Sequence, residues 1–424
     1  MSILLKNSTF IDWKTLDFSH VNIFIEKGKN EIQFPDKTDH LVNRSGTELL
    51  DCTGKFVTKS FGVGHHHAYS ALARGMGSPN KKPENFYEIL KYVWWTLDRC
   101  LDREMIEYSA LVTAIACAKA GSTFAIDHHS SPFAINGSLE IIAKAFDKVG
   151  ISHLLCYEIS DREGIKYKQE ALDETESYLK DHQGLVGLHA SFTVNNDTLE
   201  QAAELMNRFN SGIHVHVAED PYDQDFCLRK YGKRVIYRLN DSGLLKSPKT
   251  LLSHCLHIDE DEKDIIRNSP CWVVQNTESN LNNNVGYFNS EHLGSRIMLG
   301  TDGMHSDMLQ SSKAAFLVGQ GFDNIDYHLT YKRFRNIHNY LIENQFTGDD
   351  ENNLVVLDYN TPTPIDKNNF HGHFIYGINS NHISDVISNG RVIVRNRKMV
   401  LVDEAEILEA SKYHAARLWR KMQE

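Results

Sequence analysis

Histidine and aspartate side chains stand directly after short apolar runs along this chain. The sequence contains 22 histidines, against roughly nine expected from average usage. One histidine beside a strand is usually an ordinary core or surface side chain, but six of the eight run ends carry histidine or aspartate, which indicates a shared site. The groups that follow the runs are His65–His67, Asp127–His129, Tyr157–Glu158, His189, His214–Glu219, His254–His257, Asn276–Asn280 and Thr301–Asp302.

The spacing of these side chains fits a metal site. Side chains alternate along a strand, so His65 and His67 point to one face and can share a cation, as can His214 and His216. Zinc and iron both accept imidazole together with carboxylate. Asp302 follows a buried run, where a bare carboxylate is costly, so we expect it to face a cation or a donor. Its alternative role is the N-cap of a following helix.

Glu219 lies three residues after His216, just beyond the predicted strand. There a carboxylate can take a proton from a metal-bound water and deliver it to a leaving nitrogen without being a ligand itself. A solvated surface glutamate is the alternative. His66 alternates away from its two neighbours, so we expect it to pack against the helix layer.

Eight apolar runs predict the strands that position these side chains. They alternate with helical stretches, such as 85–98 and 104–120, as βα units of a parallel sheet do. Eight units close a (β/α)8 barrel of about 250 residues, whose reactive face lies at the carboxyl ends of the strands. The runs are Phe61–Gly64, Thr123–Ile126, His153–Cys156, Leu185–Leu188, Ile213–Val217, Thr250–Ser253, Cys271–Val274 and Arg296–Gly300.

Both ends of the chain read as β structure. Runs at 3–5, 21–25 and 31–34 predict strands, as do 354–357 and 383–394, before a helix from about Glu404 with Trp419 on its apolar side. We therefore expect an α/β fold: a (β/α)8 TIM-like barrel with a small β-sandwich domain built from the N- and C-terminal segments. The predicted boundaries are 1–55 and 349–424 for the two parts of the β domain and 56–348 for the barrel.

Composition and charge argue against several classes of partner and cellular location. A formal charge of −11 over 424 residues argues against nucleic acid or anionic membranes as partners. The first residues lack a basic region followed by a long apolar region, so we expect no signal peptide. We also expect no membrane span, because the most apolar later stretch, 110–126, is interrupted by Lys119 and Gly121. Seven single cysteines without a Cys-x-x-Cys pair fit reduced thiols. We expect a cytoplasmic protein that acts on a small-molecule substrate.

Ordered motifs extend over nearly the whole chain. They are Phe61–Gly75, Gly187–Ala190, His214–Glu219, Leu252–His257, Asn276–Asn280 and Leu299–Gly303. Together they resemble the amidohydrolase superfamily, in its branch of amino-heterocycle deaminases and triazine hydrolases. Within that branch the chain looks most like the SsnA-type aminohydrolases, through Trp94–Arg99 and Asp127–Pro132.

The resemblance implies a mononuclear site that binds one divalent metal, Zn²⁺ first and Fe²⁺ second. The implied ligands are His65, His67, His216 and Asp302. It also implies that Glu219 shuttles protons, that His254 polarises the substrate or the attacking water, and that Asp302 doubles as a base on that water. His189 stands where relatives with two metals carry a bridging carboxylated lysine, which argues for one metal.

Further residues are candidates for substrate contact. His189 matches a position that often faces the substrate, and the others are Trp94, His128, His129, Glu158 and His305. Trp94 belongs to a segment that can form a lid and stack on a flat heterocycle. The alternative is a helix face packed on the barrel, formed by Phe86, Leu90, Val93, Leu97 and Leu101.

Three stretches depart from the family pattern. Lys59-Ser60 stand where the family usually has Pro-Gly, and Thr277 replaces the usual Pro after Asn276. The stretch 348–353 lacks the usual Gly-Lys and Ala-Asp pieces. These departures concern loop shape and leave the ligand set intact.

The expected function is a metal-dependent deaminase of an amino-substituted N-heterocycle, purine- or pterin-like, in which a metal hydroxide attacks and ammonia leaves. One alternative is hydrolysis of another C–N bond, in a cyclic amide or formimino group, or of a C–Cl bond, because the same residues do not encode the leaving group. A second alternative is a metal-binding relative without catalysis. Family habit implies a homo-oligomer, a dimer or larger.

Overall fold

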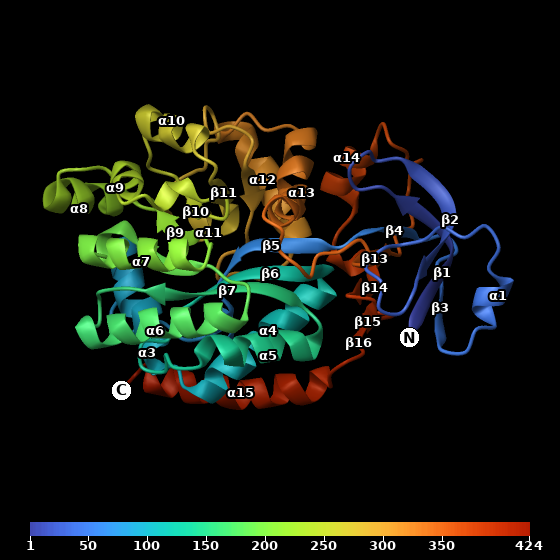
Figure 1. Cartoon of the computed structure of the whole chain (residues 1–424), viewed down its shortest axis with the longest axis horizontal. Coiled ribbons are helices and arrows are strands. Elements are labelled where there is room, and N and C mark those ends of the chain that lie inside the picture. The colour runs from blue at the N-terminus through green and yellow to red at the C-terminus, as the bar shows by residue number, and fades with distance from the viewer.

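A parallel eight-stranded sheet forms the centre of the larger lobe in Figure 1. The computed structural model describes all 424 residues. The sheet runs in chain order from β5 to β12, and a bridge between His66 and Asp302 joins its two edges into a nearly closed barrel. Each predicted apolar run overlaps one strand, so the predicted fold class is confirmed. The strands are β5 (Phe61–His66), β6 (Ser122–His129), β7 (Ser152–Ile159), β8 (Val186–Ala190), β9 (Ile213–Val217), β10 (Leu251–His254), β11 (Trp272–Gln275) and β12 (Ile297–Leu299).

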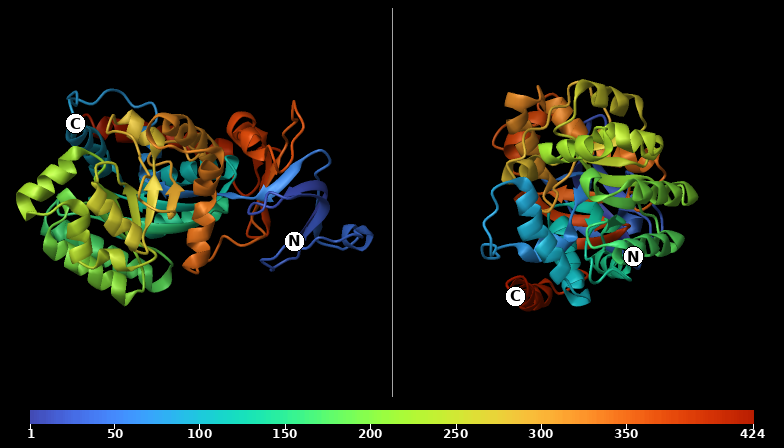
Figure 2. Two further views of the ribbon diagram at one scale, coloured as in Figure 1. Left: turned by 90° about the horizontal axis from the view of Figure 1, so that it is seen from above. Right: turned by 90° about the vertical axis from the view of Figure 1, so that its left-hand side faces the viewer.

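Helices surround the barrel (Figures 1 and 2). Their apolar side chains pack with those of the strands in the main hydrophobic core. Local signals set their ends: the Asp259 carboxylate accepts from the Glu262 N–H at the start of α10, and Gly150, at φ 94°, ends α5. The main barrel helices are α4 (Arg103–Lys119), α5 (Ser138–Val149), α6 (Ile165–Asp181), α7 (Asn196–Arg208), α8 (Pro221–Tyr231), α9 (Val235–Asp241), α10 (Glu260–Asn268), α11 (Thr277–Asn282), α12 (Met308–Phe322) and α13 (Tyr327–Glu343). Shorter pieces are α1 (Asp39–Val42), η1 (Ala68–Ala73), η3 (Ser191–Thr193), η4 (Leu244–Lys246), α14 (Phe370–Gly372), η5 (His373–Gly377) and η6 (Ser380–His382).

The segment between β5 and α4 differs from the single helix predicted over 85–98. It consists of α2 (Phe86–Ile89), one π turn η2 (Leu90–Trp94) and α3 (Trp95–Cys100). The Asn85 side chain caps α2 by accepting from the Glu88 N–H. A π turn inside a helix changes the direction in which the following side chains point.

A second sheet forms the smaller lobe and joins the two ends of the chain. Its order is β16-β15-β14-β13-β4-β1-β2. The additional strand β3 runs parallel to the first half of β1, on the side opposite β2. The central pair places β4 antiparallel to β13, with Val57 opposite Val356. The strands are β1 (Ser2–Ile11), β2 (Phe18–Ile25), β3 (Thr47–Asp51), β4 (Phe56–Lys59), β13 (Leu354–Leu357), β14 (Ile383–Ser388), β15 (Arg391–Arg395) and β16 (Lys398–Met399).

Two details of this lobe differ from the sequence predictions. The run 31–34 is not a strand and makes one bridge, from Gln33 to Phe24, because Pro35 has no N–H with which to continue the ladder. On the other side of β1 from β2, the sheet contains β3, which was not predicted. Because β4 pairs within this sheet, we propose that the β domain extends to Ser60 and that the barrel begins at Phe61.

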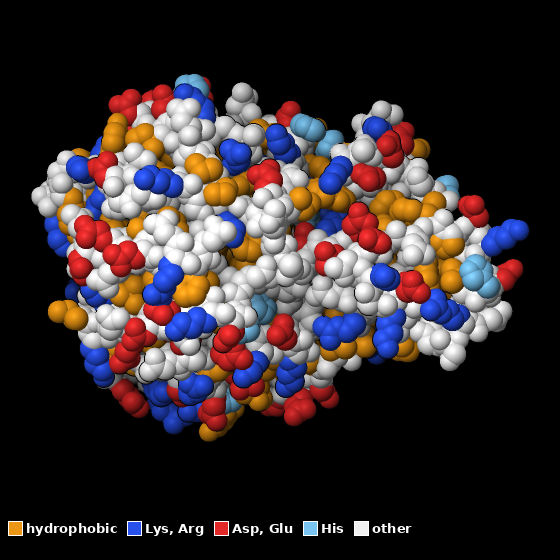
Figure 3. All heavy atoms as spheres, in the orientation of Figure 1, with side chains coloured by type: hydrophobic (Ala, Val, Ile, Leu, Met, Phe, Trp, Pro, Cys, Tyr) orange, Lys and Arg blue, Asp and Glu red, His pale blue; other side chains and the backbone are white.

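The terminal helix α15 (Glu404–Lys421) starts at the predicted residue and packs along α4 on the barrel (Figure 1). The Trp419 indole donates to the Leu72 carbonyl at 2.8 Å, so its aromatic side faces the protein. No helix combines the length and hydrophobicity needed to cross a bilayer. Acidic and basic side chains are interspersed over the face shown in Figure 3, which presents no continuous cationic surface.

Candidate functional site

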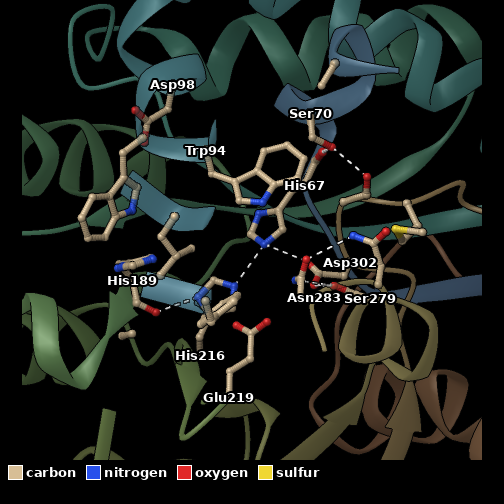
Figure 4. A pocket seen from close by; sticks show the side chains of 18 of the residues that line it. His67, Ser70, Trp94, Asp98, His189, His216, Glu219, Ser279, Asn283 and Asp302 are labelled. Carbon is tan, nitrogen blue, oxygen red and sulfur yellow. Dashed lines mark hydrogen bonds and ion pairs between the residues drawn. The ribbon is translucent and has the colours of Figure 1, made fainter. Parts of the chain in front are cut away.

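Four potential metal ligands converge at the carboxyl ends of the barrel strands. Their ligand atoms all lie within 4.8 Å of one another, and the residues are His65, His67, His216 and Asp302. The His67 Nε2 atom lies 3.0 Å from both His216 Nε2 and Asp302 Oδ1, and His65 Nε2 lies 3.5 Å from the same oxygen. Figure 4 shows His67, His216 and Asp302 pointing toward one another from the ends of three different strands.

Sharp backbone turns aim several of these side chains. Ala218, His254 and Asp302 have φ values of 44°, 71° and 51°, a left-handed conformation uncommon for residues other than glycine. Each follows or ends a strand, so the turn directs the chain across the barrel mouth. Asp302 is not a helix N-cap, because the next helix begins at Met308 and Asp307 caps it.

Glu219 and His254 lie beside the ligand cluster. The His254 Nε2 atom is 3.6 Å from Glu219 Oε2 and 3.8 Å from Asp302 Oδ2. The His254 Nδ1–H donates to Asn280 Oδ1 at 2.8 Å, which leaves Nε2 facing the two carboxylates. The Ser279 hydroxyl donates to Asp302 Oδ2 at 2.5 Å.

Burial and mutual charge perturb this group strongly. Burial raises the pKa of Glu219 to about 7, against the opposing effect of His254. Burial lowers the pKa of His67, but the hydrogen bond and charge of Asp302 outweigh burial and raise that pKa to about 9. Burial raises the pKa of Asp302, but His65 and His67 hold it well below its usual value. Such opposed shifts within one cleft are typical of active sites.

The donor set fits a divalent metal. The His65 Nε2 atom is buried and has no hydrogen-bond partner, although it points at the other three donors. A buried nitrogen without a partner costs free energy unless something else binds it. Three imidazoles and one carboxylate suit zinc or iron and do not suit the oxygen-preferring calcium or magnesium.

A cavity of about 430 Å³ opens above the cluster. Its wall contains Glu219 and Asp302, two of the three proposed proton-handling residues, but not His254. Its floor includes His67, His216, Glu219 and Asp302. Aromatic side chains form much of the rest: Phe86, Tyr87, Trp94, Trp95, Phe192 and Tyr222. A mainly apolar wall with a few polar groups at one end is typical of small-molecule sites.

The cavity wall contains four of the six predicted substrate contacts. His189, Trp94, Glu158 and His305 line it, and His305 Nε2 bonds to Glu278 at 2.8 Å. His128 and His129 do not line it. The His128 ring lies between His67 and Glu158, and His129 bonds to Ser131 at 2.8 Å.

The segment predicted either to form a lid or to pack on the barrel contains residues that pack and residues that line the cavity. Phe86 and Leu90 pack with Trp95 in a small apolar cluster, while Leu97 and Leu101 belong to the main core. Trp94 and Trp95 both line the cavity, although they are consecutive residues. This segment therefore both packs on the barrel and contributes to the cavity wall.

A buried ionic network that sequence reasoning missed forms one end of the cavity. The Arg162 guanidinium donates to Asp98 at 2.9 Å and to Glu158 at 3.1 Å. It also lies over the Trp95 ring, 4.7 Å from its centre. Burial raises the pKa of Glu158 to about 7, although Arg162 opposes it. No spacing rule connects Asp98 with Arg162, which lie 64 residues apart.

Sequence comparisons show which family this chain belongs to. The sequence profile of the amidohydrolase family matches residues 64–334. A protein of Caldanaerobacter subterraneus named 5-methylthioadenosine/S-adenosylhomocysteine deaminase is 25% identical over 99% of both chains.

Solved structures show the same fold at lower sequence identity. A zinc-bound adenosine deaminase from Xanthomonas campestris has a TM-score of 0.82 at 16% identity and covers 98% of each chain. A zinc complex of the atrazine chlorohydrolase TrzN from Arthrobacter aurescens has a TM-score of 0.81 at 15% identity, covering 97% of this chain and all of that one.

Proposed function

Because this chain belongs to the amidohydrolase family, we propose that it is a metal-dependent deaminase of an amino-substituted N-heterocycle, purine- or pterin-like. The observation that carries the proposal is the cluster of four ligand atoms within 4.8 Å, at the floor of an aromatic cavity. The similarity to a deaminase of methylthioadenosine over the full length favours an amino group as the leaving group.

His65, His67, His216 and Asp302 would hold one divalent metal, with zinc as our first assignment and iron as the second. Both structural neighbours described above are zinc-bound, which favours zinc. When bound, the metal supplies Lewis-acid chemistry and lowers the pKa of water toward about 7. The Asp302 Oδ2 atom, turned toward His254, is placed to accept a proton from an attacking water.

Glu219 is placed to move that proton to the leaving nitrogen. Its pKa of about 7 lets it hold a proton in one step and release it in the next near neutral pH. Because His254 already donates from Nδ1 to Asn280, its Nε2 is the atom free to contact the substrate or the attacking water. The two side chains face each other across 3.6 Å.

The cavity wall supports a flat, nitrogen-rich substrate. Trp94 and His67 both line the cavity (Figure 4), where the Trp94 indole can stack on a heterocycle. Glu158 and His189 offer polar groups to the edge of that ring, and His305 lies at the wall near Asp302. We assign His128 and His129 indirect roles, His128 beside Glu158 and His129 beside Ser131.

Metal analysis with a substrate panel tests the proposal. We expect about one zinc or iron per chain, lost in Asp302→Ala, and ammonia release from at least one of the aminopurines, aminopyrimidines, pterins and triazines tested. Two metals per chain would move the assignment to a cyclic amidase, and protein without metal, purified without chelator, would overturn it.

We further propose a cytoplasmic homo-oligomer, a dimer or larger. All seven cysteines are unpaired, which favours a reducing compartment. A mass of two or more chains by light scattering would support the oligomer, and a monomer at micromolar concentration would contradict it.

A further inference from the structure

The three histidine ligands are oriented in two different ways. The Nδ1–H of His67 donates to the backbone carbonyl of His128 at 2.6 Å, and that of His216 donates to the carbonyl of His189 at 2.7 Å. His65 has no such carbonyl partner. Its Nδ1 lies 2.8 Å from the Nε2 atom of His214, a side chain.

We propose that His214 and Cys156 form a hydrogen-bond relay that fixes the tautomer of His65 and thereby tunes its affinity for the metal. The proposal rests on the metal centre of the proposed function. Partners of this kind hold a ligating imidazole in the correct tautomer and orientation. Unlike a backbone carbonyl, this partner can be changed by mutation.

The donor and the acceptor of each hydrogen bond can be assigned by starting from the Cys156 thiol, at the far end of the relay from His65. The Cys156 thiol donates to the Asp127 carbonyl at 3.5 Å, so the sulfur lone pairs remain as acceptors. The His214 Nδ1–H then donates to Cys156 Sγ at 3.6 Å, which leaves His214 Nε2 as an acceptor. His65 must therefore donate from Nδ1 and present its Nε2 lone pair to the cluster.

Reversing the relay would block the metal site. If His214 donated from Nε2, the proton of His65 would move to Nε2, the atom that lies 3.5 Å from Asp302. Ser253 Oγ lies 3.3 Å from His214 Nε2 and can donate to the same nitrogen, which supports its role as an acceptor. His65, His214, Cys156 and Ser253 are all fully buried, so no solvent competes with these bonds.

The position of His214 in the fold explains why it reaches only this ligand. It lies two residues before His216 on β9, so both side chains point into the barrel, with His214 one layer deeper. Cys156 lies on β7 at the same depth.

Zinc affinity of purified full-length variants tests the relay. The dissociation constant is measured by competition with a chelator, and the visible spectrum of the Co²⁺-loaded protein reports ligand geometry. For His214→Phe we expect zinc binding to weaken about 10- to 100-fold, with a changed cobalt spectrum. His214→Gln, which can still accept from His65, should recover part of the loss.

Cys156 provides a milder pair of variants that removes few atoms. Cys156→Ala should weaken zinc binding about 2- to 10-fold, the effect of one neutral hydrogen bond, and Cys156→Ser should stay near wild type. The double variant His214→Phe/Cys156→Ala should bind no more weakly than His214→Phe alone, since Cys156 acts through His214.

His338→Phe is the matched control, because His338 is equally buried but bonds to Asp349 near the amino end of β5. Its zinc affinity should equal that of wild type even if its melting temperature falls. Unchanged affinity and spectrum in both His214→Phe and Cys156→Ala, or strictly additive losses, would overturn the relay alone. A wild-type chain that binds no zinc would overturn the metal centre itself.

Discussion

Substitution of Glu219 tests the release of the leaving group without removing a proposed metal ligand. It is a half-buried carboxylate beside the four-ligand cluster but not part of it, and burial raises its pKa to about 7. Glu219→Gln cannot carry a proton to a departing amine. We therefore expect kcat for ammonia release to fall by about 10²- to 10⁴-fold, with metal content unchanged. Ammonia release and elemental analysis on the same samples measure both.

A chloro-substituted ring is the control for this prediction. Chloride leaves without a proton, so any dechlorination by the wild type should be reduced far less in Glu219→Gln. Equal losses for the two leaving groups would show that Glu219 acts before the leaving group departs, and would contradict its role as the proton donor.

Strand periodicity predicted the pairs His65/His67 and His214/His216 as candidate ligands, and the family resemblance selected His216 over His214 as a proposed ligand. His65 and His67 alternate on one strand, and the end of each parallel strand lies at the same barrel mouth. Ser279 and Asn280 could not be assigned as partners of Asp302 and His254. Their contacts depend on how the first turn of α11 sits over β12, which no local pattern encodes.

At the scale of elements, the helical segment between β5 and α4 brings two consecutive tryptophans to the cavity wall, Trp94 at the end of the π turn η2 and Trp95 at the start of α3. An α-helix rotates by about 100° per residue, so consecutive tryptophans would point in different directions. Trp94 and Trp95 nevertheless both line the cavity. Helical periodicity correctly predicted that Phe86 and Leu97 are buried, but it cannot reveal a turn that holds one extra residue.

Trp94→Ala should weaken substrate binding more than it slows the chemical step. Stacking of a base on an aromatic side chain contributes about 1–3 kcal/mol, so we expect KM to rise by roughly 5- to 150-fold with a smaller change in kcat. Steady-state kinetics with the substrate found in the panel measures both constants.

Tyr92→Ala provides the matched control within the same turn. Tyr92 contacts Lys81 and Glu88 and does not line the cavity. Its KM should match that of the wild type. If both variants raised KM equally, the effect would come from distortion of η2 and not from stacking by Trp94.

At the scale of the whole molecule, two departures from the family pattern meet in space. Lys59, which ends β4, pairs with Asp349, which precedes β13, at 2.8 Å. Asp349 also bonds to His338 on α13 at 2.7 Å. The cluster thus ties the β domain to a barrel helix. Sequence reasoning identified both unusual stretches, but 290 residues separate them, so their pairing required the structure.

The Lys59–Asp349–His338 cluster gives a prediction about acid stability. Burial raises the pKa of Asp349, but His338 and Lys59 outweigh burial and lower that pKa to about 2. A carboxylate whose pKa is lower in the folded state stabilises the fold above its unfolded pKa, near 3.8, and this contribution is lost as pH falls toward 2. The shift corresponds to about 2 kcal/mol at neutral pH.

Asp349→Asn should therefore change both the size and the pH dependence of stability. At pH 7 we expect it to lower the free energy of unfolding by about 3–5 kcal/mol, because Lys59 is left buried without its partner. Between pH 4 and pH 2 the wild type should lose stability more steeply than the variant, since only the wild type must protonate Asp349. Urea unfolding at each pH measures the two curves. Parallel curves would mean that Asp349 titrates alike in the folded and unfolded chains, and that the β domain is held to the barrel by apolar contacts and not by this ion pair.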